Sequence, residues 1–362
     1  PFNHRILPLA TLTDKCTQIK WGITAFEKAF NRQPEGMWLP ETAVDTETLR
    51  IMSAHGVKFT ILAPWQVEVD QGQSPYLIDL GNGTSIVVFV YHGKLSSTMS
   101  FDTFATGNAD AFAEFYIKPE IDRYNPDQCI LIATDGELYG HHQPFRDKFL
   151  AHLLNGTIKE AGLTLTWPAL WLKQHKVIGK ARIVENTSWS CHHGVDRWKQ
   201  ECECTPGSAW KSALKRAFDR FNDLIFEDYC ALMTENGIDP VEARDEYIHI
   251  ELGSVDFSKW LETRSVKKLD SQVYTRIQLA LSAQFTAQKM FTSCGWFFDD
   301  LTRIEPRNNI SYAAHAAYLM QKATGKDYTG EVVVLLREAV DRSNQLTAAD
   351  IFIYAYHRFQ TS

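Results

Sequence analysis

The sequence predicts an α/β unit that extends to about residue 205, followed by a helical domain over residues 206–362. In the first half of the chain, short apolar runs alternate with stretches in which apolar residues recur at helical spacing. The apolar runs are continuous, which is typical of strands that are buried on both faces of a sheet. Because strands that alternate with helices form parallel βαβ units, we expect a parallel barrel or a doubly wound sheet in this half.

The individual elements of the first half follow from the same pattern. Strands are expected over residues 57–62, 85–91, 128–134 and 163–167, and helices over residues 46–55 and 109–124. The runs VKFTIL and SIVVFVY, at 57–62 and 85–91, are rich in the β-branched and aromatic residues that favour strands.

After residue 205 the pattern is almost wholly helical. One apolar face recurs at three- and four-residue steps, at Trp210, Leu214, Phe218, Phe221, Ile225 and Tyr229. Asp239 followed by Pro240 predicts a helix start, because the aspartate can cap the helix and proline fits at its first position. Further helices are expected over residues 273–285, 311–324 (ending at Gly325) and 332–340.

Composition excludes several classes of protein. With 44% hydrophobic and 22% charged residues, the 362-residue chain can build one large core or two ordinary ones. Its net charge of −7 argues against a nucleic-acid-binding protein, which needs a basic face. No apolar run reaches the ~18 residues of a membrane-spanning helix, so we expect neither nucleic acid nor a membrane as a partner. No glycine-rich phosphate fingerprint leads into a helix, and we expect no organic cofactor.

The seven cysteines show no regular disulfide spacing. For a chain of this length reduced thiols are the default, which predicts a cytoplasmic location. Cys191, Cys202 and Cys204, with His192 and His193 beside the first of them, offer ligands of the kind that zinc binds. However, they lack the paired Cys-x-x-Cys elements of a structural zinc site, and this spacing favours packed thiols without a metal.

Two carboxylates stand out by their position. Glu41 ends the segment GMWLPE and precedes the first helical spacing, and Asp135 follows the apolar strand expected to end at Ala133. In parallel barrels the carboxyl ends of the strands carry the active site, so an acid there is a functional candidate. Two carboxyl groups that face one pocket can act as nucleophile and proton donor. The alternative for Asp135 is an ordinary turn or helix cap, since Asp before Gly is common there.

Two further segments combine aromatic and polar side chains. Residues 186–198 hold two Trp, two His and one Arg in a loop, a set that suits sugar, because indole faces stack on the C–H face of a pyranose. The alternative is a connecting loop held by buried Trp. Residues 292–300 bring three aromatic residues beside two acids, and we expect Trp296 and Asp299 to line a cleft. A core aromatic patch is the alternative there.

Taken in order, these segments resemble the conserved motifs of glycoside hydrolase family 57. Residues 2–9 (FNHRILPL) resemble its second region, and residues 36–41 (GMWLPE) resemble its third. Residues 135–141 (DGELYGH) resemble the fourth region, and residues 187–198 are similar to the fifth. Ordered motifs over about 200 residues are far more specific than any one of them. In the helical half, residues 293–300 look like a poorly characterised bacterial branch of the family.

The resemblance implies an incomplete parallel (β/α)-barrel followed by an all-helical domain, and a retaining enzyme that acts on α-glucans. Glu41 would be the nucleophile and Asp135 the acid/base, with the two carboxyl groups about 5–5.5 Å apart. The residues expected to contact sugar are His4, Trp38, His141, Trp189, Trp296 and Asp299. Water as the acceptor gives hydrolysis, whereas a sugar hydroxyl gives transfer or branching.

The sequence departs from the family at its start. The first region, a His-Gln-Pro motif on the first strand, is absent, and the chain begins with Pro1 at the second region. We therefore expect the chain to be part of a longer protein, without the first barrel strand and one wall of the sugar site. The tail of the bacterial branch also means that the substrates of the known amylases and glucanotransferases do not transfer directly.

Two other functions stay open. The first is a metal-dependent carbohydrate hydrolase related to zinc α-mannosidases and polysaccharide deacetylases, with Asp135, His141 and His142 as ligands. Adjacent histidines on a strand point to opposite faces, which weakens that interpretation. The second is a glucan-binding or regulatory protein that retains the cleft without turnover.

Overall fold

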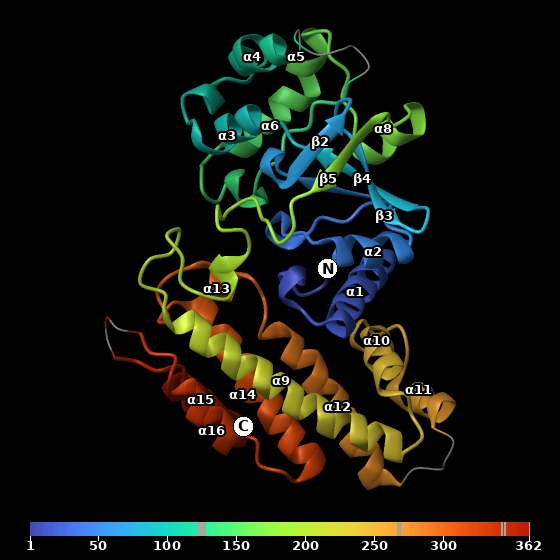
Figure 1. Ribbon diagram of the computed structural model, residues 1–362, viewed down its shortest axis with the longest axis vertical. Helices are drawn as coiled ribbons and strands as arrows, with labels where there is room; N and C mark the ends of the chain where they lie inside the picture. The colour runs from blue at the N-terminus through green and yellow to red at the C-terminus, as the bar shows by residue number, and fades with distance from the viewer. Residues whose placement is uncertain (122, 124–127, 266–269, 342, 344, 362) are drawn as a thin grey trace. The chain divides into compact units, whose positions relative to one another are not determined.

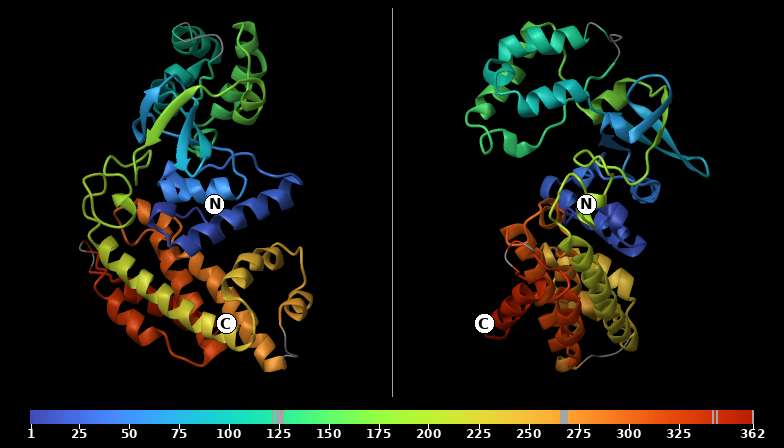
Figure 2. Two further views of the ribbon diagram at one scale, coloured as in Figure 1. Left: turned by 45° about the vertical axis from the view of Figure 1, so that its right-hand side comes forward. Right: turned by 60° about the vertical axis from the view of Figure 1, so that its left-hand side comes forward.

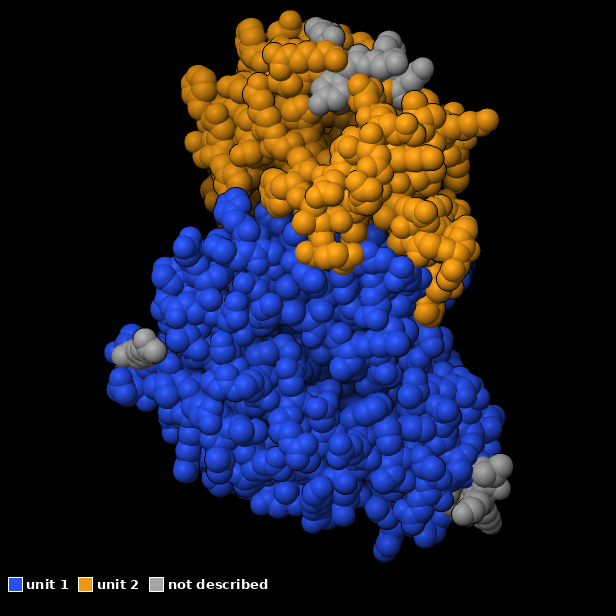
Figure 3. Space-filling view, in the orientation of Figure 1, with its two compact units in different colours: residues 1–34, 39–51, 186–362 blue, residues 35–38, 52–185 orange. Residues whose placement is uncertain are grey.

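Two compact units, each discontinuous in sequence, make up the chain. The computed structural model describes residues 1–121, 123, 128–265, 270–341, 343 and 345–361 (Figure 1). Unit 1 comprises residues 1–34, 39–51 and 186–362, and unit 2 comprises residues 35–38 and 52–185 (Figure 3). This division does not follow the boundary expected near residue 205, because the amino-terminal residues pack into the helical core of the second half.

Unit 2 contains one mixed sheet of five strands in the order β1-β4-β3-β5-β2. The strands are β1 (Phe59–Leu62), β2 (Val67–Gln71), β3 (Tyr76–Gly81), β4 (Thr84–Val90) and β5 (Gly179–Ile183). β1 pairs with β4 and β3 with β5 in parallel, whereas β3–β4 and β2–β5 are antiparallel. The α/β class is confirmed, and the expected strands at 57–62 and 85–91 are β1 and β4. The all-parallel pairing is wrong, because Asn82 and Gly83, both with positive φ, close β3 and β4 into a tight hairpin.

Two expected strands are absent. Residues 128–134 and 163–167, all described, form no strand. In the first segment, backbone pairing is limited to single contacts, such as the N–H of His92 donating to the carbonyl of Leu131 at 2.7 Å. In the second, Leu165 and Trp167 are 50% and 60% exposed. A short apolar run becomes a strand only where a neighbouring strand offers a ladder, and neither segment has one.

The helices of unit 2 are short. They are α3 (Gly93–Phe101), α4 (Ala109–Phe112), α5 (Lys118–Ile121), α6 (Arg146–His152), α7 (Ile158–Glu160) and α8 (Pro168–Gln174), while α2 (Thr46–Ala54) spans the division between the units. α2 confirms the helix expected over residues 46–55. The helix expected over 109–124 is α4, a π-helical segment and α5, and residues 122 and 124 lie outside the described part. These helices share a small core around Phe112 and Phe149.

Unit 1 is a helical assembly built around long helices that run side by side (Figure 2). Its helices are α1 (Leu12–Phe30), α9 (Trp210–Glu235), α10 (Pro240–Glu251), α11 (Phe257–Arg264), α12 (Ser271–Lys289), α13 (Cys294–Phe297), α14 (Ile304–Thr324), α15 (Thr329–Leu336) and α16 (Ala348–Thr361). The apolar face predicted on α9, from Trp210 to Tyr229, is buried in the core. Asp239 caps α10 by accepting the N–H of Glu242 at 2.8 Å, as expected. Gly325 ends α14 in the left-handed conformation.

Short helical turns connect these elements. The 3₁₀ turns are η1 (Leu7–Leu9), η2 (Pro40–Thr42), η3 (Pro64–Gln66), η4 (Ala105–Gly107), η6 (Gly136–Leu138) and η8 (Asp196–Trp198), and the π-helical segments are η5 (Ala113–Ile117) and η7 (Leu153–Thr157). Among the helices of the described residues, none has both the length and the apolar character needed to cross a bilayer.

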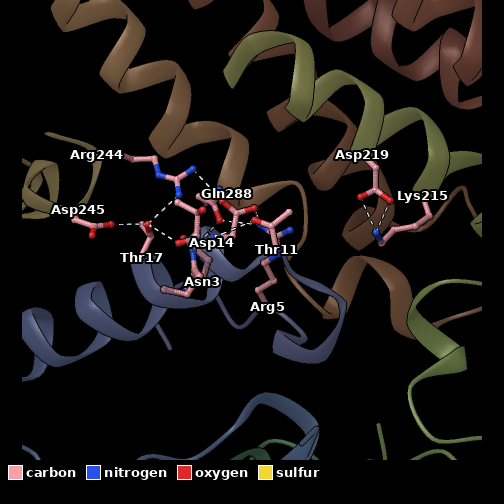
Figure 4. A network of polar contacts seen from close by, with 12 residues as sticks. Asn3, Arg5, Thr11, Asp14, Thr17, Lys215, Asp219, Arg244, Asp245 and Gln288 are labelled. Carbon is pink, nitrogen blue, oxygen red and sulfur yellow. Dashed lines mark hydrogen bonds and ion pairs between the residues drawn. The ribbon is translucent and has the colours of Figure 1, made fainter. Parts of the chain in front are cut away.

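A buried ion network docks the amino-terminal segment onto the helical half (Figure 4). Asp14, on α1, lies 2.9 Å from both Arg5 and Arg244, and Gln288 of α12 donates to it at 3.0 Å. All four side chains are buried. Burial by itself raises the pKa of Asp14, but the charges of Arg5 and Arg244 outweigh it, so the pKa lies below its usual 3.8. Each buried charge in the network thus has a partner of opposite sign. These ion pairs join Arg5 and α1 to α10, which explains why the amino-terminal residues belong to unit 1.

Candidate functional site

Glu41 lies in a strained turn at the start of unit 1's second segment. It is the middle residue of η2, with φ 56° and ψ 22°, and the next residue, Thr42, also has a positive φ of 50°. The turn is closed by the N–H of Thr42 donating to Leu39 at 2.8 Å. Two successive non-glycine residues in the left-handed region cost of order 1–3 kcal/mol each, so surrounding structure must impose this conformation.

The loop after β5 supplies that structure. Val44 pairs with this loop through two backbone hydrogen bonds. Its N–H donates to the carbonyl of Thr187 at 3.0 Å, and its carbonyl accepts the N–H of Asn186 at 2.9 Å. The N–H of Trp189 donates to the carbonyl of Glu41 at 3.0 Å. The turn around Glu41 is therefore held by a segment far along the chain.

The same loop orients the carboxylate of Glu41. The indole N–H of Trp189 donates to Oε2 at 2.9 Å, across 148 positions of sequence, and the hydroxyl of Ser190 donates to the same oxygen at 2.7 Å. Throughout the described part of the chain, Oε1 accepts no hydrogen bond. One oxygen is thus held by two donors, and the other is available for chemistry.

His4 lies in the segment that pairs with the residues before α13. Its Nδ1 is 2.6 Å from the hydroxyl of Ser293, and its carbonyl accepts the N–H of Ser293 at 2.9 Å. The next residue, Cys294, lies within the electrostatic reach of Glu41: partial burial raises the pKa of the Cys294 thiol, and the Glu41 charge raises it further. Three segments of unit 1 therefore meet here, those of His4, Glu41 and Ser293.

Trp296 and Asp299, expected to line a cleft, occupy different environments. Trp296 is 2% exposed, donates its indole N–H to the carbonyl of Met290 at 3.3 Å and packs edge-on against Phe218. It is a core residue of unit 1, which agrees with the alternative of a core aromatic patch and not with a sugar contact. Asp299 is exposed, and its carbonyl accepts the indole N–H of Trp210 at 2.6 Å. Its carboxylate role stays a prediction.

Asp135, in unit 2, begins the turn η6. Asp135 is exposed, and its side chain does not cap the turn. Its backbone carbonyl accepts the N–H of Leu138 at 3.4 Å. The alternative of a helix-cap aspartate therefore does not account for this carboxylate. His141 follows in the turns that come after η6, and its ring lies 4.9 Å from that of His142. The two rings thus contact each other, because these residues are not on a strand.

Trp38 precedes the Glu41 turn but belongs to unit 2. It is 36% exposed, and its segment joins the edge of β1, where the N–H of Met37 donates to Phe59 at 3.1 Å. Gly36 is required here, because a Cβ would lie 2.2 Å from the ring of Phe59. The Gly of the GMWLPE motif therefore allows the segment to pass over Phe59 and present Trp38 to solvent.

Ligand-type side chains gather at a place that the sequence did not favour. Among the described residues, Cys191, His193, Cys202 and Cys204 lie close enough together to hold one metal ion. Asp135, His141 and His142 do not form such a group. Ser190 is the contact that sequence reasoning missed, since nothing local distinguishes a serine that bonds a distant glutamate.

Comparison with known proteins finds two family models that match successive parts of the chain. Residues 1–179 match the model described as Glycosyl hydrolase family 57, and residues 207–355 match Domain of unknown function (DUF3536). No curated protein sequence matches the chain.

Three solved structures with a similar fold are enzymes by title. An exo-type maltose-forming amylase from Pyrococcus sp. ST04 has 16% identity and a TM-score of 0.72, covering 99% of this chain and 65% of that one. A family 57 branching enzyme from Thermococcus kodakaraensis has 14% identity and a TM-score of 0.58, covering 99% and 69%. A 4-alpha-glucanotransferase from Thermococcus litoralis has 14% identity and a TM-score of 0.51, covering 87% and 46%.

The chain therefore spans between 46% and 69% of the length of these three proteins. At such low identity the likeness concerns the fold, while the family match covers the motifs that hold both Glu41 and Asp135. Residues 1–179, just under half of the chain, are therefore similar to glycosyl hydrolase family 57.

Proposed function

We propose that the protein is a retaining glycoside hydrolase or transglycosylase that acts on α-glucans, with Glu41 as nucleophile and Asp135 as acid/base. The observation that carries this proposal is the Glu41 carboxylate, held at Oε2 by Trp189 and Ser190 within a strained turn. Backbone strain of this kind persists where function selects it. The family match and the printed activities of the similar structures, which all concern glucans, support the substrate class.

In the first step, Oε1 of Glu41 attacks the anomeric carbon of the bound sugar. The bond between that carbon and the leaving glucan oxygen breaks, and the carboxyl proton of Asp135 passes to this oxygen. The product is a glycosyl ester on Glu41 and a free glucan end. Because Trp189 and Ser190 hold Oε2, the carboxylate is already oriented before the sugar arrives, which lowers the entropic cost of the attack.

In the second step, the Asp135 carboxylate removes a proton from the incoming acceptor. The acceptor oxygen attacks the same anomeric carbon, the ester bond breaks, and Glu41 returns as a carboxylate with the original anomeric configuration restored. Water as the acceptor gives hydrolysis, and a sugar hydroxyl gives transfer or branching. Exclusion of water from the cleft decides between them.

The remaining expected contacts have side chains of the kinds that bind sugars. Trp38 and Trp189 offer indole faces, and His4 and His141 are exposed imidazoles that can bond hydroxyls. Asp299 stays a further proposed contact. The cytoplasmic location likewise stays a prediction.

The decisive experiment traps the intermediate. The protein is expressed from the complete gene and incubated with a fluorinated α-glucosyl fluoride, which forms the glycosyl ester quickly and releases it slowly. Mass spectrometry of the peptides should find the sugar on Glu41, and Glu41→Gln should remain unlabelled. Labelling of another carboxylate would assign the nucleophile elsewhere.

Turnover on maltooligosaccharides, amylose and glycogen separates the enzyme from a binding protein. The wild-type protein should release product with retained anomeric configuration, as measured by NMR. Binding of these glucans with neither turnover nor labelling would instead support the non-catalytic alternative. The metal-dependent alternative requires an ion bound by Asp135, His141 and His142, and these side chains form no close ligand group among the described residues.

A further inference from the structure

A second group of reactive side chains lies in the loop between β5 and α9. Cys191, His193, Cys202 and Cys204 each present one ligand atom, and these four atoms all lie within 4.8 Å of one another. The sulfur of Cys191 is 3.9 Å from that of Cys202 and 4.0 Å from Nδ1 of His193. The sulfur of Cys204 is 3.6 Å from the same Nδ1.

The three separations just given, 3.6 to 4.0 Å, are close to those of a tetrahedral metal site. Zinc binds thiolate at about 2.3 Å and imidazole at about 2.0 Å, so ligand atoms at tetrahedral corners lie about 3.5–3.8 Å apart. A disulfide between Cys191 and Cys202 would need its sulfurs at about 2.05 Å, and at 3.9 Å they are not bonded. The cluster is therefore spaced for a shared ion and not for oxidation.

Two tight turns present the ligands in pairs. In the first, the N–H of Gly194 donates to the carbonyl of Cys191 at 3.2 Å, and Gly194 takes a positive φ of 73°. In the second, the N–H of Thr205 donates to the carbonyl of Cys202 at 2.9 Å. Each turn places ligands at its first and third residues, and this is how a spacing without Cys-x-x-Cys still brings four ligands together.

The second nitrogen of His193 has a partner of its own. Nε2 lies 3.7 Å from a carboxylate oxygen of Glu203, while Nδ1 faces the sulfurs. Histidines that bind metals usually direct their other nitrogen to a carboxylate, which sets the tautomer and the ring orientation. The His193 ring is thus oriented as a ligand through Nδ1.

Two positively charged side chains next to the cluster favour a negatively charged group there. Lys211 is fully buried, and its ammonium donates to the carbonyl of Arg197 at 2.9 Å and to Thr205 at 3.3 Å. Within the described residues, Lys211 forms no ion pair with a carboxylate. The Arg197 guanidinium also points at this loop, donating to the carbonyl of Cys204 at 3.4 Å. A buried cation without a counter-charge is costly, whereas Zn²⁺ with three thiolates and a neutral imidazole carries a net charge of −1.

We propose that Cys191, His193, Cys202 and Cys204 bind one structural zinc ion. On binding, the three thiols release their protons to solvent and the imidazole stays neutral. Four protein ligands leave no open position, so the ion stabilises the loop and does not take part in chemistry. The loop begins immediately after Trp189 and Ser190, so the ion would anchor the segment that bonds Glu41, a consequence that rests on the proposed function.

Metal analysis with matched variants tests the site. Protein purified without added metal or chelator should contain about one zinc ion per chain. His193→Gln and Cys202→Ser should each lose most of it, whereas the neighbouring His192→Gln and the α9 variant Cys230→Ser should retain it. Zinc retained by both ligand variants would place the ion elsewhere and overturn the proposal.

Cobalt substitution keeps the test decisive if the ligand variants fail to fold. Wild-type protein stripped of metal and loaded with Co²⁺ should show thiolate-to-cobalt charge-transfer absorption and the intense visible bands of tetrahedral cobalt. Addition of zinc should abolish both and raise the Tm. A wild-type protein that carries no zinc and gives no thiolate–cobalt absorption would overturn the proposal, whatever its activity on glucans.

Discussion

The two proposed catalytic carboxylates are held in different ways. Glu41 lies in a turn whose conformation depends on backbone pairing with residues 186–189 and whose side chain is bonded by Trp189 and Ser190. Asp135 lies at the exposed start of η6, a turn closed by hydrogen bonds within a few residues. The proposed nucleophile is therefore held by tertiary structure, and the proposed acid/base lies in a local turn.

This difference has a chemical sense. A nucleophile must be fixed relative to the anomeric carbon, and errors of an ångström reduce the rate strongly. A general acid must reach the leaving oxygen and afterwards the acceptor, and exposure gives it access to exchange its proton with solvent. Variants around the two carboxylates should therefore differ in the size and the breadth of their effects.

Replacing the nucleophile should have the largest effect. Glu41→Gln keeps both donors engaged but removes the attacking oxygen, so kcat/KM on maltooligosaccharides should fall at least about 1,000-fold. Steady-state assays measure this, with circular dichroism to show that the fold is intact. Activity within about tenfold of wild type would refute the role of Glu41.

Replacing the acid/base should have a large effect that depends on the leaving group. Asp135→Asn should lower kcat/KM on maltooligosaccharides by about 100- to 10,000-fold, because the leaving oxygen loses its proton donor. The loss should be much smaller on an aryl glucoside with an acidic phenol, which leaves without protonation. Glu137→Gln, in the same turn, is the matched control and should stay near wild type; an equal loss there would remove Asp135 from its role.

Breaking the ion network should destabilise unit 1 in particular. Asp14→Asn leaves Arg5 and Arg244 without their shared carboxylate, at a cost of about 3–5 kcal/mol. Hydrogen exchange should show faster opening of α1 and α10, while β1 and β4 in unit 2 keep their protection. Uniform acceleration in both units would show that the network does not act within unit 1 alone.

The same network should make the wild type sensitive to acid. Burial alone raises the pKa of Asp14, but the charges of the two arginines outweigh it, so the folded value lies below the usual 3.8 of the unfolded chain. Its contribution is therefore complete above about pH 4 to 5 and is lost as the pH falls through the folded pKa. Urea unfolding at pH 7 and pH 3 should show this loss, and Asp14→Asn should show less of it. An equal loss in both proteins would contradict the assignment.

Removing one donor to Glu41 should have the smallest of these effects. Ser190→Ala and Trp189→Phe each delete a hydrogen bond to a carboxylate, worth about 1.5–3 kcal/mol, so kcat should fall about 10- to 100-fold. The rate constant for formation of the trapped ester should fall by the same factor as kcat. Values of kcat like those of the wild type would show that the turn alone orients Glu41.

Local pattern predicted much of the fold. The apolar face of α9, the Asp239 cap of α10 and the strands β1 and β4 all follow from side-chain periodicity or from hydrogen bonds within one turn. The exposed strand β2 went unpredicted, because its polar sequence carries no burial signal. The strand expected at 128–134 was wrong for the opposite reason, since it has an apolar run but no ladder partner.

The candidate site likewise has features set by local sequence and features set by tertiary contacts. The motifs around Glu41 and Asp135 mark both carboxylates in the sequence, since each carries its own turn chemistry and lies next to recognisable residues. What the tertiary structure decided is which distant side chains meet them: Ser190 at Glu41, Trp296 in the core, and His193 among three cysteines. Local periodicity arises from hydrogen bonds and burial over a few residues, whereas contacts across more than a hundred positions depend on how the whole chain packs.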